Sequence, residues 1–200
     1  MNEITRRGLI FGAATAGACA LLAGVERISI WAFADSGASE DDPGPVKIVK
    51  FADDGARLGV FTLAKVRKRK SEWKKQLTPL QYNVTRRAST EYAFSGALYN
   101  QEAAGLYRCV DCGNALFDSK AKFDSGTGWP SFWEPIAAEN VREKKDFSIG
   151  VLRTEVQCAL CEAHLGHVFT DGPGPTGLRY CMNSAALLFV PRKASLRDIP

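Results

Sequence analysis

The residues of this sequence best suited to covalent chemistry are its six cysteines, and one of them stands apart. Four fall into two Cys-x-x-Cys pairs and Cys19 lies in an apolar N-terminal run, which leaves Cys181 without such a partner. Arg179 precedes Cys181 by two residues and Asn183 follows it by two. In a strand, residues two apart project from the same face, so these three side chains would lie together. We therefore predict that Cys181 is a nucleophile whose thiolate is favoured by the Arg179 cation.

The two Cys-x-x-Cys pairs predict a metal site. They are Cys109/Cys112 and Cys158/Cys161, with 45 residues between the pairs. This spacing directs two sulfurs at one tetrahedral ion, and two such turns make a closed four-thiolate zinc site with no open position for a substrate. Two disulfides or a redox-active dithiol are the alternatives. We expect one structural zinc ion per chain, with a role in stability rather than in the reaction.

The only two histidines, His164 and His167, come shortly after the second cysteine pair. An imidazole titrates near neutral pH, so each of them can act as a general acid or position a water molecule. The alternative is a structural hydrogen bond, which is more easily accepted for His164 than for His167.

A loop at 122–133 is rich in glycine and aromatic residues. Glycine lets the backbone approach a ligand closely, and the indole of Trp129 can wall an apolar pocket. The same composition also suits a turn in the core. The loop is therefore a candidate, on these grounds alone, for part of a substrate pocket.

Short strand-like runs broken by turns surround these residues and must position them. The pattern is typical of a mainly β, α+β fold with antiparallel sheets and short helices near the N-terminal side. Ser71 is the expected N-cap of a helix over 72–77, and Thr78-Pro79 begins a second helix that continues over 80–87. The predicted strands are 46–51, 57–63, 106–110, 115–117, 147–154, 168–169, 178–182 and 186–190.

Size and charge restrict the class of protein. The chain has 200 residues, of which 46% are hydrophobic, and 26 basic against 22 acidic residues give a net charge of +4. That is enough chain for one domain with a core, and the charge does not demand an anionic partner. The basic run at 65–70 raises nucleic-acid binding as an alternative. No aromatic residues interleave it as a stacking platform requires, so a solvated surface is favoured.

Residues 1–34 are typical of a twin-arginine signal peptide rather than of a folded segment. A twin-arginine pattern at 5–10 leads into an apolar run at 9–25, and small residues suit cleavage after Ala34. We therefore expect export by the twin-arginine route, to the periplasm. The alternatives are an uncleaved membrane anchor and lipidation of Cys19.

A polar linker at 35–45 then leads into a single domain at 46–200. Loss of Cys19 with the leader leaves an odd number of cysteines, which in an oxidising compartment indicates a reactive thiol or an intermolecular pair. Because the twin-arginine route carries folded proteins, the metal site can fill before export.

Five short segments occur together and in order within residues 71–190: FSG at 94–96, GLYRC at 105–109, SGTGWPSF at 125–132, HLGHVF at 164–169 and RYCMNS at 179–184. In this combination the chain resembles the peptide methionine-(R)-S-oxide reductase family. The resemblance implies two antiparallel sheets with N-terminal helices, and reduction of methionine-R-sulfoxide in peptides and proteins. It also implies that Cys181 attacks the sulfoxide sulfur, that methionine leaves, and that Cys181 becomes a sulfenic acid.

The resemblance also implies roles for the remaining residues. Trp129 would wall the pocket that accepts the substrate's methyl group, and we expect Phe132 and Phe169 to contribute to substrate binding. His164, His167 and Asn183 match positions that bind the polar side of the sulfoxide, directly or through water, and Arg179 matches the residue that assists the thiolate. The four paired cysteines, Cys109, Cys112, Cys158 and Cys161, match the zinc ligands found in many members.

The sequence departs from that pattern at Thr127, where many relatives carry a second cysteine that forms a disulfide with the nucleophile. We therefore expect an external thiol or a thioredoxin-like reductant to attack oxidised Cys181 directly. The other expected partners are oxidised proteins, with no nucleic acid and no stable membrane association once the signal is cleaved. A zinc-knuckle binding module and a thiol-disulfide oxidoreductase are the rival classes. The export signal weighs against the first and the lack of a βαβ context against the second.

Overall fold

The computed structural model describes residues 44–148 and 150–192. The predicted twin-arginine leader at 1–34, Cys19 and almost all of the predicted linker at 35–45 lie outside the described residues. Neither α-helix in the described part of the chain has the length and hydrophobicity needed to cross a bilayer.

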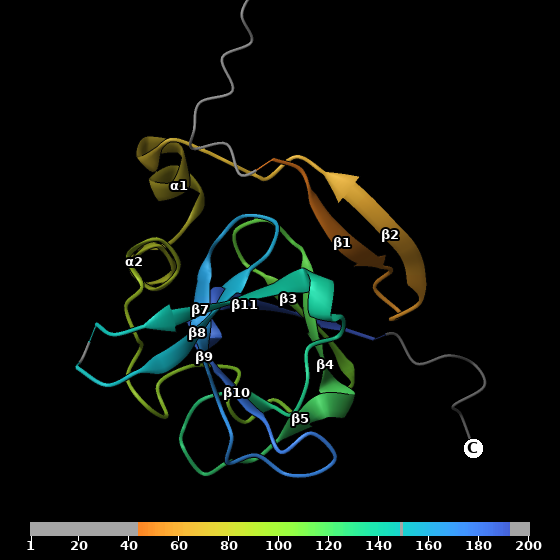
Figure 1. Cartoon of the computed structure of the whole chain (residues 1–200), viewed down its shortest axis with the longest axis vertical. Helices are drawn as coiled ribbons and strands as arrows, with labels where there is room; N and C mark the ends of the chain where they lie inside the picture. The colour runs from red at the N-terminus through yellow and green to blue at the C-terminus, as the bar shows by residue number, and fades with distance from the viewer. Residues whose placement is uncertain (1–43, 149, 193–200) are drawn as a thin grey trace, which may run out of the picture. The chain divides into compact units, whose positions relative to one another are not determined.

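Eleven strands, two α-helices and three short 3-10 turns make up the described residues (Figure 1). The fold is mainly β with a short helical flank, as the sequence predicts. The strands are β1 Val46–Phe51, β2 Arg57–Leu63, β3 Gly105–Cys109, β4 Ala115–Asp118, β5 Lys122–Phe123, β6 Ser131–Phe132, β7 Val141–Asp146, β8 Arg153–Cys158, β9 His164–Phe169, β10 Arg179–Met182 and β11 Leu187–Pro191. The helices are α1 Lys70–Gln76 and α2 Pro79–Arg87, and the turns are η1 Ser119–Ala121, η2 Ala138–Asn140 and η3 Ser184–Ala186.

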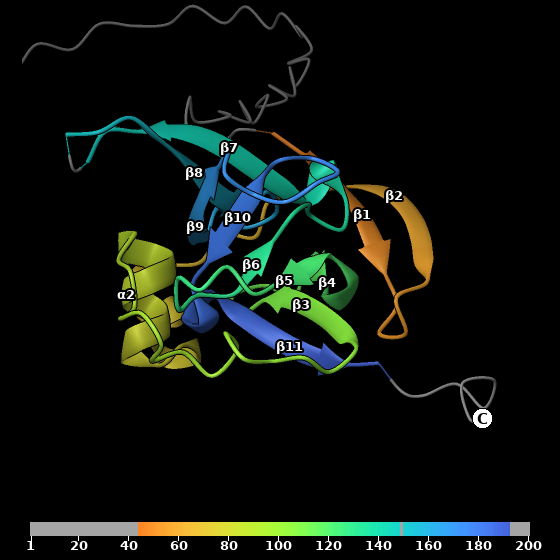
Figure 2. The ribbon, with the colours of Figure 1, turned by 90° about the horizontal axis from the view of Figure 1, so that it is seen from below.

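Within residues 44–148 and 150–192, all the strand pairings are antiparallel, and they form three sheets (Figures 1 and 2). The largest has six strands in the order β5-β6-β10-β9-β8-β7, and a second has three in the order β11-β3-β4. These two sheets agree with the expected architecture. The β1-β2 hairpin forms a separate two-stranded sheet.

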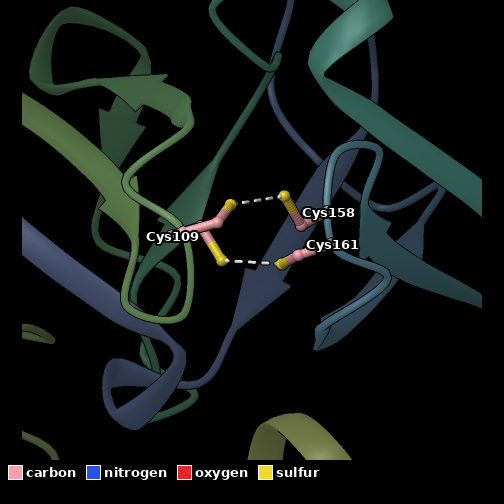
Figure 3. Close-up of side chains that lie close together, drawn as sticks. Cys109, Cys158 and Cys161 are labelled. Carbon is pink, nitrogen blue, oxygen red and sulfur yellow. Dashed lines mark hydrogen bonds between the residues drawn. The ribbon is translucent and has the colours of Figure 1, made fainter. Parts of the chain in front are cut away.

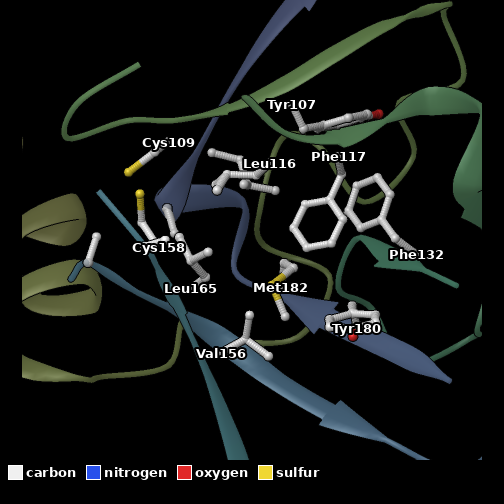
Figure 4. Packing of buried hydrophobic residues seen from close by; sticks show 14 of the residues in the cluster. Tyr107, Cys109, Leu116, Phe117, Phe132, Val156, Cys158, Leu165, Tyr180 and Met182 are labelled. Carbon is white, nitrogen blue, oxygen red and sulfur yellow. The ribbon is translucent and has the colours of Figure 1, made fainter. Parts of the chain in front are cut away.

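Aromatic side chains from both main sheets fill the core between them (Figure 4). Phe117 of β4 stacks on Phe132 of β6 with ring centroids 4.4 Å apart, and Tyr107 of β3 meets Phe132 edge-on at 4.8 Å. Tyr180 and Met182 of β10 point into the same cluster. Each such large apolar side chain contributes roughly 1.5–3 kcal/mol when fully buried. Because side chains alternate along a strand, the opposite face of β10 is free to carry Cys181.

The helices begin close to the predicted positions, with one difference. Thr78 caps α2 as expected, since its side chain accepts a hydrogen bond from the Gln81 backbone N–H at 3.2 Å. Helix α1 starts earlier than predicted: its N-cap is Arg69, and Ser71 lies inside the first turn. The reason is Glu72, whose carboxylate accepts the Arg69 backbone N–H at 2.8 Å and so satisfies a donor at the helix start.

The hairpin of β7 and β8 differs most from the sequence prediction. A strand was predicted over 147–154, but β8 begins only at Arg153. The apolar residues Phe147, Val151 and Leu152 are exposed in the connection between the two strands. The partner strand β7 has four exposed polar side chains in its middle, so it shows no apolar alternation. It lies at the edge of the sheet, where charged residues are tolerated and discourage pairing with other chains.

Candidate active site and metal centre

The two cysteine pairs meet in one cluster (Figure 3). All four Sγ atoms lie within 4.8 Å of one another, and Cys109–Cys161 and Cys112–Cys158 are each separated by 3.6 Å between sulfurs. Four sulfurs placed tetrahedrally at the zinc–sulfur distance of about 2.3 Å would be about 3.8 Å apart, whereas a disulfide needs about 2.05 Å. The cysteines are free thiols, and their geometry suits a structural zinc ion.

Each pair lies in a tight turn that closes on itself. The Gly113 N–H donates to Cys109 O at 2.8 Å, and the Glu162 N–H donates to Cys158 O at 2.9 Å. Both donors have left-handed backbone conformations, with φ of +76° at Gly113 and +58° at Glu162. The first turn follows β3 and the second follows β8, so a zinc ion would cross-link the two main sheets. Hydrogen bonds with the other thiols, Cys109 first, hold the pKa of Cys158 well below its usual value.

Helix α2 connects the two cysteine turns through Arg86. Its guanidinium donates to Cys161 O at 3.1 and 3.0 Å, and its Nε lies 3.3 Å from the carboxylate of Asp111 in the first turn. Burial raises the pKa of the Asp111 carboxyl, and the Arg86 charge opposes this shift. The helical flank therefore stabilises the metal centre.

Cys181 lies on β10, inside the six-stranded sheet, and its side chain is half-buried. Its neighbours in register are Ser131 of β6 and His167 of β9, and His167 is in turn opposite Glu155 of β8. Residues directly opposite in an antiparallel pair share a face, so these four polar side chains form a row away from the aromatic core. Burial raises the pKa of the Cys181 thiol, and hydrogen bonding to Thr127 and the Arg179 charge oppose the rise.

A β-bulge brings both histidines to that face. Val156 of β8 pairs with Gly166, but the next residue, Gln157, pairs with His164, so Leu165 is an extra residue in β9. The bulge reverses the alternation, which places His164 on the same side as His167. Their rings lie 5.5 Å apart between centroids.

The same bulge anchors the end of the Cys181 strand. The carbonyl group of Leu165 accepts hydrogen bonds from both the backbone N–H of Asn183, at 2.9 Å, and its side-chain Nδ2, at 3.0 Å. Gly166 is needed beside it, because a Cβ there would come within 2.1 Å of the Cys181 carbonyl oxygen. Close contact between β9 and β10 therefore holds Cys181, His167 and Asn183 together.

Each histidine has a carboxylate partner. The Nε2 of His167 lies 2.8 Å from Asp146 Oδ2, and the Nδ1 of His164 lies 2.7 Å from Glu155 Oε1. Burial lowers the pKa of His167, against the opposing effect of Asp146. Asp146 itself accepts a hydrogen bond from the Ser148 backbone, and this bond and the one to His167 hold its pKa far below the usual range. His167 is therefore a mainly neutral imidazole near pH 7, with its ring orientation held by Asp146.

Arg179 lies beside Cys181 as expected, but its charge is shared. Its guanidinium binds the carboxylate of Asp171 through two hydrogen bonds of 2.8 Å and covers the Phe169 ring at 4.4 Å from the centroid. The hydrogen bonds with Asp171 raise the pKa of Arg179, so this side chain stays cationic.

A pocket of about 130 Å³ opens beside Cys181. Its apolar walls are Trp129 and Phe169, and polar groups line most of the remainder. The polar lining comes from Thr90, Arg153, His167, Cys181 and Asn183. An aromatic pocket with a thiol and an imidazole on its wall can bind a small sulfur-containing side chain and supply a nucleophile and a proton.

Two predicted site residues lie elsewhere. Phe132 is completely buried in the aromatic core and does not contribute to this pocket, because its neighbour Ser131 occupies the face toward Cys181. His164 is buried beside His167 and is not among the described residues that line the pocket. Its Nε2 has no hydrogen-bond partner within the described ranges.

Glu91 is a site residue that no sequence motif indicates. Its buried carboxylate accepts the backbone N–H groups of Ser184 and Ala185 at 2.5 and 2.8 Å, at the start of η3. Its own N–H donates to Asn183 Oδ1 at 3.0 Å, and its carbonyl accepts the Trp129 indole N–H at 3.2 Å. Glu91 therefore holds two walls of the pocket. Asp146 and Glu155 were also not predicted, because their histidine partners lie on other strands.

Comparison with known proteins gives a consistent result. A model of the SelR domain matches residues 77–191. The chain is 54% identical over 132 residues to a protein of Pseudomonas aeruginosa, 56% over 128 residues to one of Bradyrhizobium diazoefficiens, and 57% over 130 residues to one of Pseudomonas fluorescens. Each of the three bears the name peptide methionine sulfoxide reductase MsrB. The alignments cover 66%, 64% and 65% of this chain and 100%, 92% and 100% of the relatives.

Proposed function

The chain belongs to the MsrB family of peptide methionine sulfoxide reductases, and from this premise we propose that it reduces methionine-R-sulfoxide in oxidised proteins with Cys181 as the nucleophile. One observation supports this assignment above the others. Cys181 and His167 are directly opposite on adjacent strands, and both line the aromatic pocket of about 130 Å³. A pocket of this size suits one side chain rather than a folded partner.

The proposed first step is attack of the Cys181 sulfur on the sulfoxide sulfur. The S–O bond breaks, the oxygen passes to Cys181 as a sulfenic acid, and methionine leaves. Cysteine loses two electrons and methionine gains them. Trp129 and Phe169 would hold the substrate's methyl group against an apolar wall.

His167 is the proposed proton carrier for this step. Its hydrogen bond to Asp146 favours the tautomer with the proton on Nε2, which leaves Nδ1 to accept a proton from the thiol. The resulting imidazolium would then protonate the sulfoxide oxygen as the S–O bond breaks. Arg179 would support the thiolate, and Asn183 would orient the polar side of the substrate.

His164 is assigned a supporting role. Because His164 is buried beside His167, is bound to Glu155 and does not line the pocket, we assign it to holding the neighbouring ring in place rather than to substrate contact.

The second half of the cycle requires an external reductant. Thr127 Oγ1 lies 3.9 Å from Cys181 Sγ, where a second cysteine would otherwise be placed to form a disulfide. Two thiol groups from outside the enzyme would instead reduce the sulfenic acid, giving a disulfide and one water molecule. The clustered cysteines Cys109, Cys112, Cys158 and Cys161 suit one zinc ion, which would stabilise the fold and take no part in either step.

We further propose that the protein is exported to the periplasm by the twin-arginine route, with residues 1–34 as the signal, 35–45 as a linker and 46–200 as the catalytic domain. Only the sequence pattern supports this proposal. Mass spectrometry of the mature protein tests it: an N-terminus at Asp35 is expected, and a retained leader would contradict cleavage.

The function is tested with the two sulfoxide epimers. Wild-type protein and Cys181→Ser are each assayed with peptides that carry methionine-R-sulfoxide or methionine-S-sulfoxide, in the presence of dithiothreitol. We expect reduction of the R-epimer by the wild type only, and no reduction of the S-epimer by either protein. Equal activity of the two proteins would overturn the assignment of Cys181. Absence of activity in both would favour a binding role.

A further inference from the structure

Three hydroxyl groups form a chain that ends at Cys181. Thr127 Oγ1 lies 3.9 Å from the Cys181 sulfur, Ser125 Oγ lies 2.8 Å from Thr127 Oγ1, and Ser131 Oγ lies 2.7 Å from Ser125 Oγ. The far end is the backbone carbonyl of Trp129, which accepts from Ser131 at 3.2 Å. Ser131 is fully buried, and Ser125 and Thr127 are half-buried.

The hydrogen bonds along this series of hydroxyls can run in either of two directions, because a hydroxyl group both donates and accepts. With Cys181 as a thiol, its S–H can donate toward Thr127, and each hydroxyl then donates onward until Ser131 donates to the Trp129 carbonyl. With Cys181 as a thiolate, the sulfur only accepts. Each O–H group then rotates the other way, so that Thr127 donates to the sulfur.

The loop that carries these hydroxyls is held by other contacts. The Gly126 N–H donates to the side chain of Asp124 at 2.8 Å, and the Phe94 N–H donates to Gly128 O at 2.9 Å. Backbone pairing with Cys181 of β10 fixes Ser131. The hydroxyl chain is therefore not needed to shape the loop, although it is aligned with the sulfur.

The charged groups around Cys181 are paired with other residues, so a hydrogen bond from a neutral hydroxyl can add to the stabilisation of the thiolate. Arg179, on the same strand, interacts with the sulfur but is hydrogen-bonded to the Asp171 carboxylate. His167 of β9 is hydrogen-bonded to Asp146, and Arg153 of β8 forms an ion pair with the same carboxylate at 2.7 Å. The loop and β6 contribute the neutral hydroxyls of Thr127, Ser125 and Ser131. Among the groups that lower the pKa of Cys181 against burial, the hydrogen bond with Thr127 comes first, followed by the Arg179 charge and a hydrogen bond with Ser131.

We propose that Thr127 is a catalytic residue that donates a hydrogen bond to the Cys181 thiolate, and that Ser125 is a positioning residue that orients its hydroxyl group. Ser131 continues the series of hydroxyls from Ser125 to the Trp129 carbonyl. The assignment rests on Cys181 being the nucleophile, as proposed above. No hydroxyl gains or loses a proton in this role, since each O–H only rotates. The position that would hold a second thiol thus serves the first half of the cycle in this chain.

The test is the pH dependence of Cys181 alkylation by iodoacetamide in the zinc-loaded protein, with the modified residue identified by mass spectrometry. Thr127→Val keeps the branched shape and removes the hydroxyl, and Thr127→Ser is the matched control that keeps it. Ser125→Ala breaks the chain one step further away. The alkylation midpoint reports the thiol–thiolate equilibrium, whereas the limiting rate at high pH reports access to the sulfur.

We expect the midpoint of Thr127→Val to rise by about one pH unit, which means about tenfold less thiolate at a pH well below the midpoint. Ser125→Ala should shift it in the same direction by less, and Thr127→Ser should stay near the wild type. A wild-type midpoint in Thr127→Val overturns the proposal, whether or not the limiting rate changes. Because alkylation needs no sulfoxide, this result is independent of whether the protein reduces methionine sulfoxide.

Discussion

Replacement of Glu91 by glutamine should weaken both the fold and the pocket. In the wild type, the two carboxylate oxygens accept two backbone N–H groups at the start of η3, at 2.5 and 2.8 Å. Glutamine offers only one oxygen, so its NH2 group would face the second N–H. The remaining donor is then buried without a partner in a site where Glu91 is only 4% exposed.

The magnitude follows from these two contacts. An unsatisfied buried N–H costs about 1–3 kcal/mol, and a hydrogen bond to a charged group contributes about 1.5–3 kcal/mol compared with about 1 kcal/mol for a neutral bond. We therefore expect Glu91→Gln to lose about 3 kcal/mol of unfolding free energy. Trp129 and Asn183 both bind the Glu91 backbone, so movement of that segment should also reduce kcat/KM for the R-sulfoxide.

Urea unfolding of the zinc-loaded protein, followed by tryptophan fluorescence, measures the first effect, and a sulfoxide peptide assay measures the second. Glu139→Gln is the matched control, because Glu139 is exposed and the same chemical change there should alter stability by less than about 0.5 kcal/mol. If Glu91→Gln unfolds at the same urea concentration as Glu139→Gln, the bonds to η3 do not contribute as argued.

Three further predictions concern the site. Asp146→Asn removes the carboxylate that raises the pKa of His167 against the effect of burial. The pKa of His167 should therefore fall further, and the acid limb of the kcat/KM profile should move to lower pH. An NMR titration of His167 that stays unchanged would refute this. Thr127→Cys should place a second sulfur close enough to form a disulfide with Cys181 after one turnover, detectable as the loss of two thiols by titration; retention of both thiols would contradict it. Removal of zinc by a chelator after partial denaturation should lower the thermal unfolding midpoint by well over 10 °C, because structural zinc contributes on the order of 10 kcal/mol to the folding free energy of small systems. An unchanged midpoint would exclude a stabilising metal.

Local patterns in the sequence were sufficient to predict much of this architecture. Thr78-Pro79 marks the start of α2 because a cap and a proline act within one turn, and the strand at Arg179–Met182 follows from its own short apolar alternation. The edge strand β7 was missed because its charged residues face solvent, and β5 and β6 because two residues show no period. The helix start at Arg69 depended on which backbone N–H the Glu72 carboxylate satisfies.

The zinc ligands and the nucleophile candidate could be identified from the sequence, because Cys-x-x-Cys spacing and an unpaired cysteine are properties of the chain itself. The convergence of the two cysteine pairs was predicted from the ligand number of zinc, and the fold confirms it, with all four sulfurs within 4.8 Å of one another. In contrast, the partners Glu91, Asp146 and Glu155 required the tertiary structure, because a carboxylate acts on whichever donor folding brings to it. The exclusion of Phe132 from the pocket was also decided there, by the face of β6 that meets the core.

The bulge at Leu165 shows most clearly what could not be predicted from the sequence. Spacing alone places His164 and His167 on opposite faces of a regular strand, yet one extra residue in the pairing of β9 with β8 puts both on the face of Cys181. The sequence by itself determined which side chains are available for thiol chemistry and metal binding. Only the tertiary structure decided which of them reach Cys181, because that depends on strand register between segments far apart in the chain.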